Sequence, residues 1–249
     1  MSDRILTALP VFNEACSVDS VLAEVLKSSP HVLVVDDGSV DGTLELLKQR
    51  DDIQLIIHPK NLGYGAALRT AFNYAIQQDF EIVVTVDCDG QHEPQRIPAF
   101  VKAAENADIV SGSRYLSVFN DDDVPPTDRR EINALVTDLI NERLGMTLTD
   151  SFCGFKAYRV EALRQLKLTE NGYAMPLELW VQAAHHRLSI CELAVPLIYL
   201  DEKRSFGDAL DDADSRLLYY FDVLEKSIAR VGSTACSTEL DTVCGDAAE

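Results

Sequence analysis

The chain has 249 residues, of which 47% are hydrophobic and 25% are charged, and its formal net charge at pH 7 is −19. Such an acidic chain is a poor candidate for binding nucleic acid, and docking on an anionic membrane favours clustered Lys and Arg over excess carboxylates. A chain of this length and composition can bury roughly 70–75% of the surface that it exposes when unfolded. Disorder over the whole length of the chain is therefore excluded. Because the chain as a whole is strongly negative, a phosphate-bearing ligand must be held by a local cluster of residues.

Targeting signals and cysteine spacing narrow the class of protein further. The longest apolar runs have strand length, well short of the roughly 18–20 residues that cross a bilayer. The first residues lack the basic and apolar pattern of a secretory signal. The six cysteines form no CxxC pair, which argues against a zinc site or a disulfide framework. The sequence therefore predicts a cytoplasmic protein with reduced thiols and no transmembrane segment.

Up to about residue 112, short β-branched apolar runs alternate with longer segments of helical periodicity. Strands are predicted at 5–9, 32–35, 53–57, 82–86 and 109–110, and helices at 18–27, 42–49, 65–77 and 94–105. This alternation is typical of an α/β fold, a Rossmann-like, mostly parallel sheet with helices on both faces. In such sheets ligands bind beyond the carboxyl ends of the strands, so the residues after each strand are the informative ones.

The second half of the chain is less regular. Residues 116–128 contain three consecutive aspartates and two adjacent prolines, and they are predicted to form a mobile loop. Helices follow at 129–144, 160–166, 175–186 and 214–231, with a strand at 190–200. No Pro-, Gly- or Ser-rich linker interrupts the pattern, so residues 1–231 are predicted to form one domain. Residues 232–249 are predicted to be a disordered acidic tail.

The fourth predicted strand is followed by Asp87-Cys88-Asp89-Gly90-Gln91. The two carboxylates and the Gln91 amide oxygen are hard ligands that suit Mg²⁺ or Mn²⁺, and such ions usually keep positions open for substrate phosphates. The sequence therefore predicts a metal site at Asp87, Asp89 and Gln91. The alternative is a turn in which Asp87 and Asp89 only cap the next helix.

The second predicted strand ends in Asp36-Asp37-Gly38-Ser39. An acid in this position of a parallel sheet can accept hydrogen bonds from a nucleobase or a ribose, and Asp37 is the better candidate for such a contact. Gly38 is expected to turn the chain with a positive φ. The alternative for Asp36 is an Asx-turn or helix cap without a ligand.

Five segments at or after strand ends together resemble the signatures of family 2 glycosyltransferases. Within that family they are most similar to the dolichyl- or polyprenyl-phosphate mannosyl or glucosyl synthases. The segments are 10–14 (PVFNE), 35–43 (VDDGSVDGT), 61–65 (NLGYG), 87–92 (DCDGQH) and 112–115 (GSRY). The resemblance covers roughly residues 4–160. It implies a GT-A fold, a nucleotide-sugar donor, Mg²⁺ or Mn²⁺, and inversion at the anomeric carbon.

The resemblance also assigns the donor site. It implies that the base, ribose and diphosphate are contacted by Pro10, Phe12, Glu14, Val35, Asp37, Asp87, Cys88 and Asp89. Arg204, in a segment similar to the family's R-x-[YF]-G, is implied to contact the donor as well. The lysine that usually follows this segment is absent, because Leu210 stands there.

The acceptor and the chemistry are assigned in the same way. Arg114, Arg129 and Arg130 resemble arginines that face the acceptor phosphate, and Asp89, Arg114 and Asp150 are the candidate catalytic residues. A divalent ion and an arginine can neutralise the charge on a leaving diphosphate. Asp150 is a base only if the acceptor is a hydroxyl, because a lipid phosphate is already an anionic nucleophile. The alternative for Asp150 is an Asx-turn or a partner to Lys156.

The leading hypothesis is therefore transfer of mannose or glucose from a GDP- or UDP-sugar to a polyprenyl or dolichyl phosphate. It places this cytoplasmic protein peripherally at the inner face of a membrane. A second hypothesis keeps the donor chemistry but uses a hydroxyl acceptor, such as a small metabolite or a glycan. A third is a nucleotide-sugar-binding module without turnover, against which the intact Asp87, Asp89, Gln91 and Arg114 argue.

Overall fold

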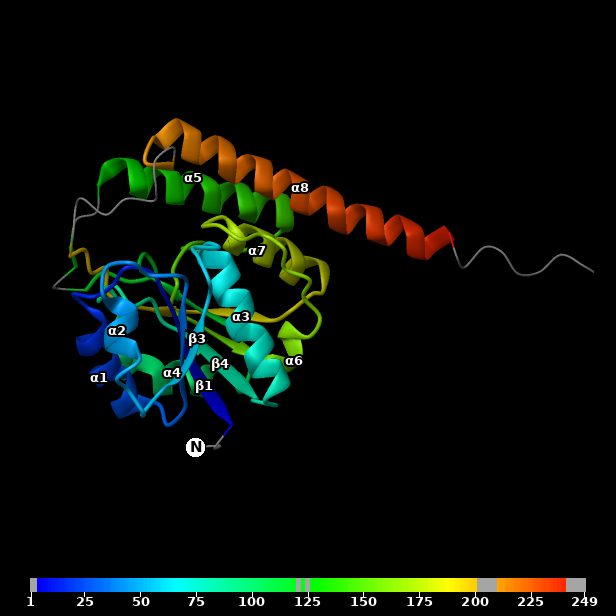
Figure 1. The fold of residues 1–249 in the computed structure, drawn as a ribbon. Helices are drawn as coiled ribbons and strands as arrows, with labels where there is room; N and C mark the ends of the chain where they lie inside the picture. Colours follow the sequence, from blue (N-terminus) through cyan, green and yellow to red (C-terminus); the bar gives the residue numbers. More distant parts are fainter. Residues whose placement is uncertain (1–3, 120–121, 124–125, 201–209, 241–249) are drawn as a thin grey trace, which may run out of the picture.

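A sheet of seven strands runs through the centre of the fold, in the order β3-β2-β1-β4-β6-β5-β7 (Figure 1). The computed structural model describes residues 4–119, 122–123, 126–200 and 210–240, with side chains as far as residue 232. The strands are β1 Ile5–Val11, β2 Val32–Asp36, β3 Gln54–Ile57, β4 Ile82–Thr85, β5 Ile109–Ser113, β6 Lys156–Arg159 and β7 Ile190–Ala194. The predicted mostly parallel sheet is confirmed.

The strand β6 runs antiparallel to both of its neighbours, β4 and β5, and the sequence pattern did not predict it. Its first residue, Lys156, pairs with Thr85, the last residue of β4. Because β6 runs the opposite way, the residues just before it lie at the same edge of the sheet as the carboxyl end of β4. The segment 150–155 is thereby brought beside the residues that follow β4.

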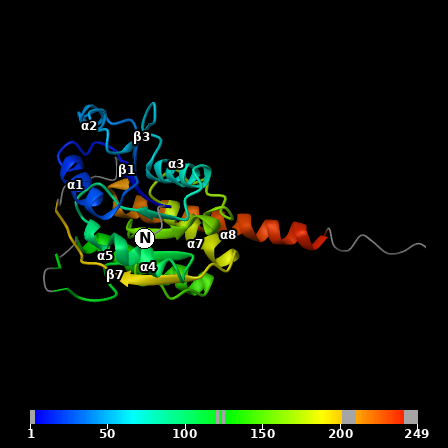
Figure 2. The ribbon, with the colours of Figure 1, turned by 90° about the horizontal axis from the view of Figure 1, so that it is seen from below.

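Helices cover both faces of the sheet, as the alternating pattern predicts (Figures 1 and 2). One apolar core contains residues of α1 (Val18–Ser28), α2 (Thr43–Leu47) and α4 (Ile97–Ala103), which follows the short 3₁₀ helix η1 (Pro94–Arg96). The opposite core contains residues of α3 (Tyr64–Gln77), α5 (Thr127–Leu144), α6 (Val160–Leu163), α7 (Met175–His185) and α8 (Ala213–Leu240). Of the helices in the described part of the chain, none has both the length and the hydrophobicity that spanning a membrane requires.

Two predicted boundaries in the C-terminal part are wrong. The strand predicted at 190–200 ends at Ala194. The last helix, predicted to end at 231, continues to Leu240, while 241–249 lie outside the described residues. Small polar residues suggested disorder there, but none of residues 232–240 is a proline that would force the helix to end. In both views α8 extends beyond the rest of the fold (Figures 1 and 2).

Candidate active site

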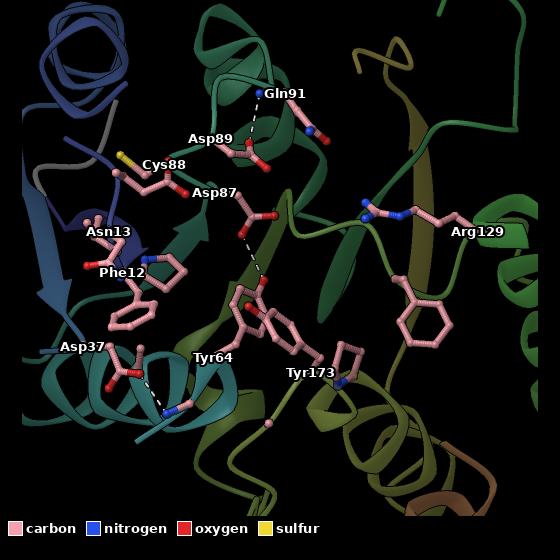
Figure 3. A pocket seen from close by; sticks show the side chains of 18 of the residues that line it. Phe12, Asn13, Asp37, Tyr64, Asp87, Cys88, Asp89, Gln91, Arg129 and Tyr173 are labelled. Atoms are coloured by element: carbon pink, nitrogen blue, oxygen red, sulfur yellow. Dashed lines mark hydrogen bonds between the residues drawn. The ribbon is translucent and has the colours of Figure 1, made fainter. Parts of the chain in front are cut away.

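A cavity of about 950 Å³ lies at the carboxyl ends of β1, β2 and β4. One side, here called the strand-end wall, is made by residues within 10–17, 61–64 and 87–91 together with Asp37. The other side, the C-terminal wall, is made by residues within 114–115, 129–133, 172–176 and 197–199 together with Phe152, Arg216 and Tyr220. Figure 3 shows Arg129 reaching into the cavity from the side opposite Phe12 and Asp89.

The turn after β1 is fixed by the loop after β2. Asn13 has the left-handed φ of 56°, which asparagine tolerates better than most residues. Its N–H donates to Ser39 Oγ over 2.9 Å, and its Oδ1 accepts the N–H of Val40, also over 2.9 Å. The N–H of Glu14 donates to Thr43 Oγ1 over 2.8 Å. Residues of the 35–43 motif therefore set the position of the 10–14 motif, which lines the cavity.

Asp37 lies at the base of the strand-end wall and is almost fully buried. Its carboxylate accepts the N–H groups of Leu62 (3.0 Å) and Gly63 (2.8 Å), and its Oδ1 lies 2.6 Å from His58 Nδ1. Asp37 therefore shapes the turn before α3 as well as facing the cavity. The predicted positive φ of Gly38 is confirmed at +77°, and a Cβ there would meet the backbone of the next loop at 2.4 Å.

The segment 87–91, here called the metal loop, follows β4 and lines the cavity. Asp89 Oδ1 accepts the N–H of Gln91 over 2.9 Å, and Asp87 Oδ2 lies 3.3 Å from His92 Nε2. Within the residues that the structure describes, no three His, Cys, Asp or Glu side chains group as a complete metal site. Mg²⁺ commonly takes one or two carboxylates and completes its shell with water and phosphate oxygens. The donor set of the metal loop fits an ion bound in this way.

Gly154, which precedes β6, packs directly against the metal loop. A Cβ added at this glycine would lie 2.0 Å from Asp87 Oδ2, well inside any real contact. We therefore expect Gly154→Ala to displace the Asp87 carboxylate and to lower metal-dependent activity by roughly 10- to 100-fold. Changes in residues that contact a metal ligand typically lower metal affinity or activity by this factor. Titrating Mn²⁺ in an activity assay checks this, and Gly232→Ala, at a glycine with open space around it and no left-handed φ, controls for the substitution itself. Equal metal dependence in the Gly154 variant and the wild type would contradict the expectation.

Arg114 and Asp150 form an ion pair at the base of the C-terminal wall. Arg114 Nε and an Nη group donate to the two carboxylate oxygens over 2.6 and 2.9 Å, and Asn133 Nδ2 donates to Asp150 over 2.9 Å. Burial alone would raise the pKa of the Asp150 carboxyl, but the guanidinium charge and these hydrogen bonds outweigh it and hold that pKa well below its usual range. Asp150 is fully buried, whereas Arg114 remains partly exposed and lines the cavity.

A buried lysine, Lys156, lies near this ion pair. Lys156 donates from Nζ to the carbonyl oxygen of Cys153, and its Nζ lies 5.5 Å from the ring centre of Trp180. Burial lowers the pKa of the Lys156 ammonium, although the nearby thiol of Cys153 and the Asp150 carboxylate favour its charged form. The indole N–H of Trp180 donates to the carbonyl oxygen of Ser151 over 2.9 Å. These contacts fix the segment 150–156, which carries Asp150 and the cavity-lining Phe152.

The C-terminal wall combines arginines with aromatic rings. Arg129 lies over the ring of Tyr199, with its Cζ 5.6 Å from the centroid. Arg216 of α8 is nearly buried and donates to Asp128 Oδ2 over 2.9 Å. The contribution of α8 was not predicted from the sequence, because an arginine and a tyrosine four residues apart occur on many helix faces. Only the helical spacing of Arg216 and Tyr220 could have suggested that they share a side.

Most of the predicted site residues meet at this cavity, but not all of them do. Lining it are Pro10, Phe12, Glu14, Asp37, Asp87, Cys88, Asp89, Gln91, Arg114 and Arg129. Three others do not line it: Val35 is buried in the core, Asp150 is buried beneath Arg114, and Arg130 is exposed on α5. Arg204 lies outside the described residues. The carbonyl of Leu210, where the family's lysine is absent, accepts a hydrogen bond from Arg216 over 2.9 Å.

Comparisons with known proteins agree with this arrangement. The family model "Glycosyl transferase family 2" matches residues 7–167. An undecaprenyl-phosphate mannosyltransferase of Micrococcus luteus is 28% identical over 84% of this chain and 90% of its own length. A polyprenol monophosphomannose synthase of Mycolicibacterium smegmatis is 28% identical over 81% of this chain and 79% of its own.

Among solved structures, the glucosyl-3-phosphoglycerate synthase of Mycobacterium tuberculosis in complex with uridine diphosphate is similar in fold. Its TM-score is 0.70 at 20% identity, over 90% of this chain and 80% of that one. Other crystals of that enzyme contain Mn²⁺ or Mg²⁺ together with uridine diphosphate. The likeness confirms the predicted GT-A fold. This chain therefore belongs to glycosyl transferase family 2 and is a glycosyltransferase.

Proposed function

We propose that this enzyme transfers a hexose from a nucleotide sugar to the phosphate of a polyprenyl phosphate, with inversion at the anomeric carbon. A phosphate oxygen of the acceptor forms the new bond to the anomeric carbon. The bond from that carbon to the donor's diphosphate breaks, and the nucleoside diphosphate leaves with the bonding electrons. The acceptor is drawn from a membrane, so the enzyme is proposed to work peripherally at the inner membrane face.

The composition of the C-terminal wall is the observation that carries this proposal. Arg114, Arg129 and Arg216 line the cavity together with apolar and aromatic residues, among them Ile132, Phe152 and Tyr220. Phe152 and Tyr220 pack with their ring centroids 4.8 Å apart. Guanidinium groups suit a phosphate, and apolar surface suits the first isoprene unit attached to it. An acceptor that is anionic at one end and hydrocarbon beyond it matches both features.

The state of Asp150 also favours an anionic acceptor. A hydroxyl acceptor would need a general base with a pKa near the working pH and within reach of its proton. Asp150 is buried, does not line the cavity, and is held ionised by Arg114. We therefore propose that Asp150 positions Arg114 and that no base is used. A phosphate acceptor needs only to be placed in line with the breaking bond.

The strand-end wall is proposed to hold the donor. Pro10, Phe12, Glu14 and Asp37 would contact the base and ribose, and Cys88 would face the diphosphate. Asp87, Asp89 and Gln91 would hold Mg²⁺ or Mn²⁺, which when bound neutralises charge on the diphosphate. Complexes of the mycobacterial neighbour with Mn²⁺ or Mg²⁺ and uridine diphosphate support this choice of ion. Arg114, at the base of the C-terminal wall, would favour the departing anion.

A transfer assay with GDP- and UDP-sugars labelled in mannose or glucose tests the proposal. With Mn²⁺ and a membrane lipid extract as acceptor, we expect label in an acid-labile lipid fraction. The same assay with small alcohols and glycans tests the alternative. Label only in a hydroxyl acceptor would overturn the lipid phosphate, and binding of donor without any transfer would favour a module without turnover.

Two neighbouring arginines provide a matched pair for the acceptor site. Arg129 lines the cavity and Arg130, the next residue of α5, does not. Losing a charge-assisted contact costs about 1.5–3 kcal/mol, so Arg129→Ala is expected to raise the KM for polyprenyl phosphate by roughly 10- to 100-fold. The KM for the nucleotide sugar should stay unchanged, and Arg130→Ala should leave both constants near the wild-type values. Equal effects of the two variants would count against an acceptor phosphate at Arg129.

A further inference from the structure

The hydroxyl of Tyr64 contacts the first carboxylate of the metal loop. Tyr64 is the first residue of α3, and its phenol donates to Asp87 Oδ1 over 3.0 Å (Figure 3). The bond therefore joins α3 to the loop after β4 inside the cavity.

Tyr64 is itself held in place by a second tyrosine. Its ring stacks on that of Tyr173, with the centroids 5.8 Å apart and the planes 18° from parallel. Tyr173 precedes α7, in a segment where Glu170 accepts a hydrogen bond from Tyr219 of α8 over 2.6 Å. The stacking limits rotation of the Tyr64 ring, which keeps its hydroxyl directed at Asp87.

Asp87 is contacted on three sides. Tyr64 donates to Oδ1, His92 Nε2 lies 3.3 Å from Oδ2, and Gly154 leaves no room for a Cβ beside the same oxygen. A carboxylate can swing about two side-chain torsions, whereas a metal ligand must stay within about 0.2 Å of its ideal distance. Contacts that fix such a group change metal affinity by roughly 10- to 100-fold when they are lost.

We propose that Tyr64 is a positioning residue for the divalent ion. Its hydroxyl holds Asp87 in the orientation in which the carboxylate binds the ion, and Tyr173 keeps the hydroxyl in place. This rests on the metal site of the proposed function. It extends that site to α3 and to the segment before α7, neither of which supplies a ligand.

The test is Mn²⁺ binding measured directly, by electron paramagnetic resonance of the free ion, to the full chain with saturating UDP or GDP. Tyr64→Phe removes the hydroxyl and keeps the ring. Tyr74→Phe removes a hydroxyl from the same helix outside the cavity and is the matched control. We expect the Kd for Mn²⁺ to rise about 10-fold in Tyr64→Phe and to match the wild type in Tyr74→Phe. Thermal unfolding of both variants should occur near the wild-type temperature.

The possible results distinguish a failure of this proposal from a failure of the proposed function on which it rests. Equal Mn²⁺ affinity in Tyr64→Phe and wild type would overturn the role of Tyr64 and leave the metal site standing. Absence of nucleotide-dependent Mn²⁺ binding in the wild type would overturn both. If Tyr64→Phe is unstable, a second variant replaces it. Tyr173→Leu removes the ring that stacks on Tyr64 and keeps the Tyr64 hydroxyl. Weaker Mn²⁺ binding in that variant supports the proposal, and unchanged binding overturns it.

Discussion

Replacing Asp89 with alanine is expected to abolish most glycosyl transfer. Asp89 lines the cavity in the metal loop, where its carboxylate also receives the N–H of Gln91. Without it, an ion would keep a single carboxylate from this loop, and the charge on the leaving diphosphate would lose its main neutralising group. By analogy with the removal of one preorganised electrostatic group, kcat should fall by at least about 100- to 1000-fold. Steady-state kinetics with a labelled donor measure the loss.

Calorimetry separates this effect from a general loss of structure. Wild-type protein should bind GDP or UDP more tightly with Mn²⁺ than without it, and Asp89→Ala should lose that difference. Asp222→Ala is the control, because Asp222 is exposed and pairs with the exposed Lys226, and such pairs contribute about 0–1 kcal/mol. Undiminished metal-dependent nucleotide binding in Asp89→Ala would remove Asp89 from the metal site.

The largest effect on stability is expected from Asp150→Asn. The substitution leaves the Arg114 guanidinium without its buried counter-charge, and breaking a buried pair from one side costs about 3–5 kcal/mol. Because Arg114 stays partly exposed, the free energy of unfolding should fall by about 3 kcal/mol, the lower end of that range. Urea unfolding followed by circular dichroism measures it. The folded variant should still turn over a polyprenyl phosphate, with a loss limited to the weaker support of Arg114, since no base is lost.

A closely matched control exists on the surface. Arg143 and Glu225 form the same two-pronged pair, at 2.7 and 3.0 Å, but both side chains are exposed. Glu225→Gln should therefore cost no more than about 1 kcal/mol. If the two variants lose equal stability, burial of the Asp150 pair is not the cause. Complete loss of turnover in folded Asp150→Asn would instead point to a hydroxyl acceptor and a catalytic base.

The buried Arg114–Asp150 pair makes the free energy of unfolding depend on pH in a defined window. The pKa of Asp150 is lower in the folded chain than its unfolded value of about 3.9, so the ionised group stabilises the fold above that value. This contribution is lost as the pH falls below about 3.9 towards the folded pKa. The difference in unfolding free energy between wild type and Asp150→Asn should therefore be constant near neutral pH and shrink in acid. A difference that grows in acid would contradict this assignment.

The sequence predicted the elements whose structure depends on residues that are close together in the chain. Strands β1, β2 and β4 are short apolar runs, and the residues that follow them, such as Asp37 and Asp89, meet at one edge because parallel strands end together. The positive φ of Gly38 follows from the same reasoning about turns. These features needed no knowledge of distant contacts.

Features that depend on distant pairing were not predictable in this way. β6 has four residues, and Lys156 within it carries a charge, so nothing in its pattern marks a central strand. Its burial between β4 and β5 is what places Asp150 under Arg114 and Gly154 against Asp87. Likewise Arg216 and Tyr220 reach the cavity only because α8 packs against α7 and α5.

The position of Trp180 gives this enzyme a built-in optical reporter. The chain contains one tryptophan, and it is fully buried, with its indole N–H hydrogen-bonded to the segment that carries Asp150. Tryptophan emission from this protein therefore has a single source. A shift in its wavelength or intensity on adding acceptor or nucleotide would report a change beside the segment that carries Asp150 and the cavity-lining Phe152, without any label having been introduced.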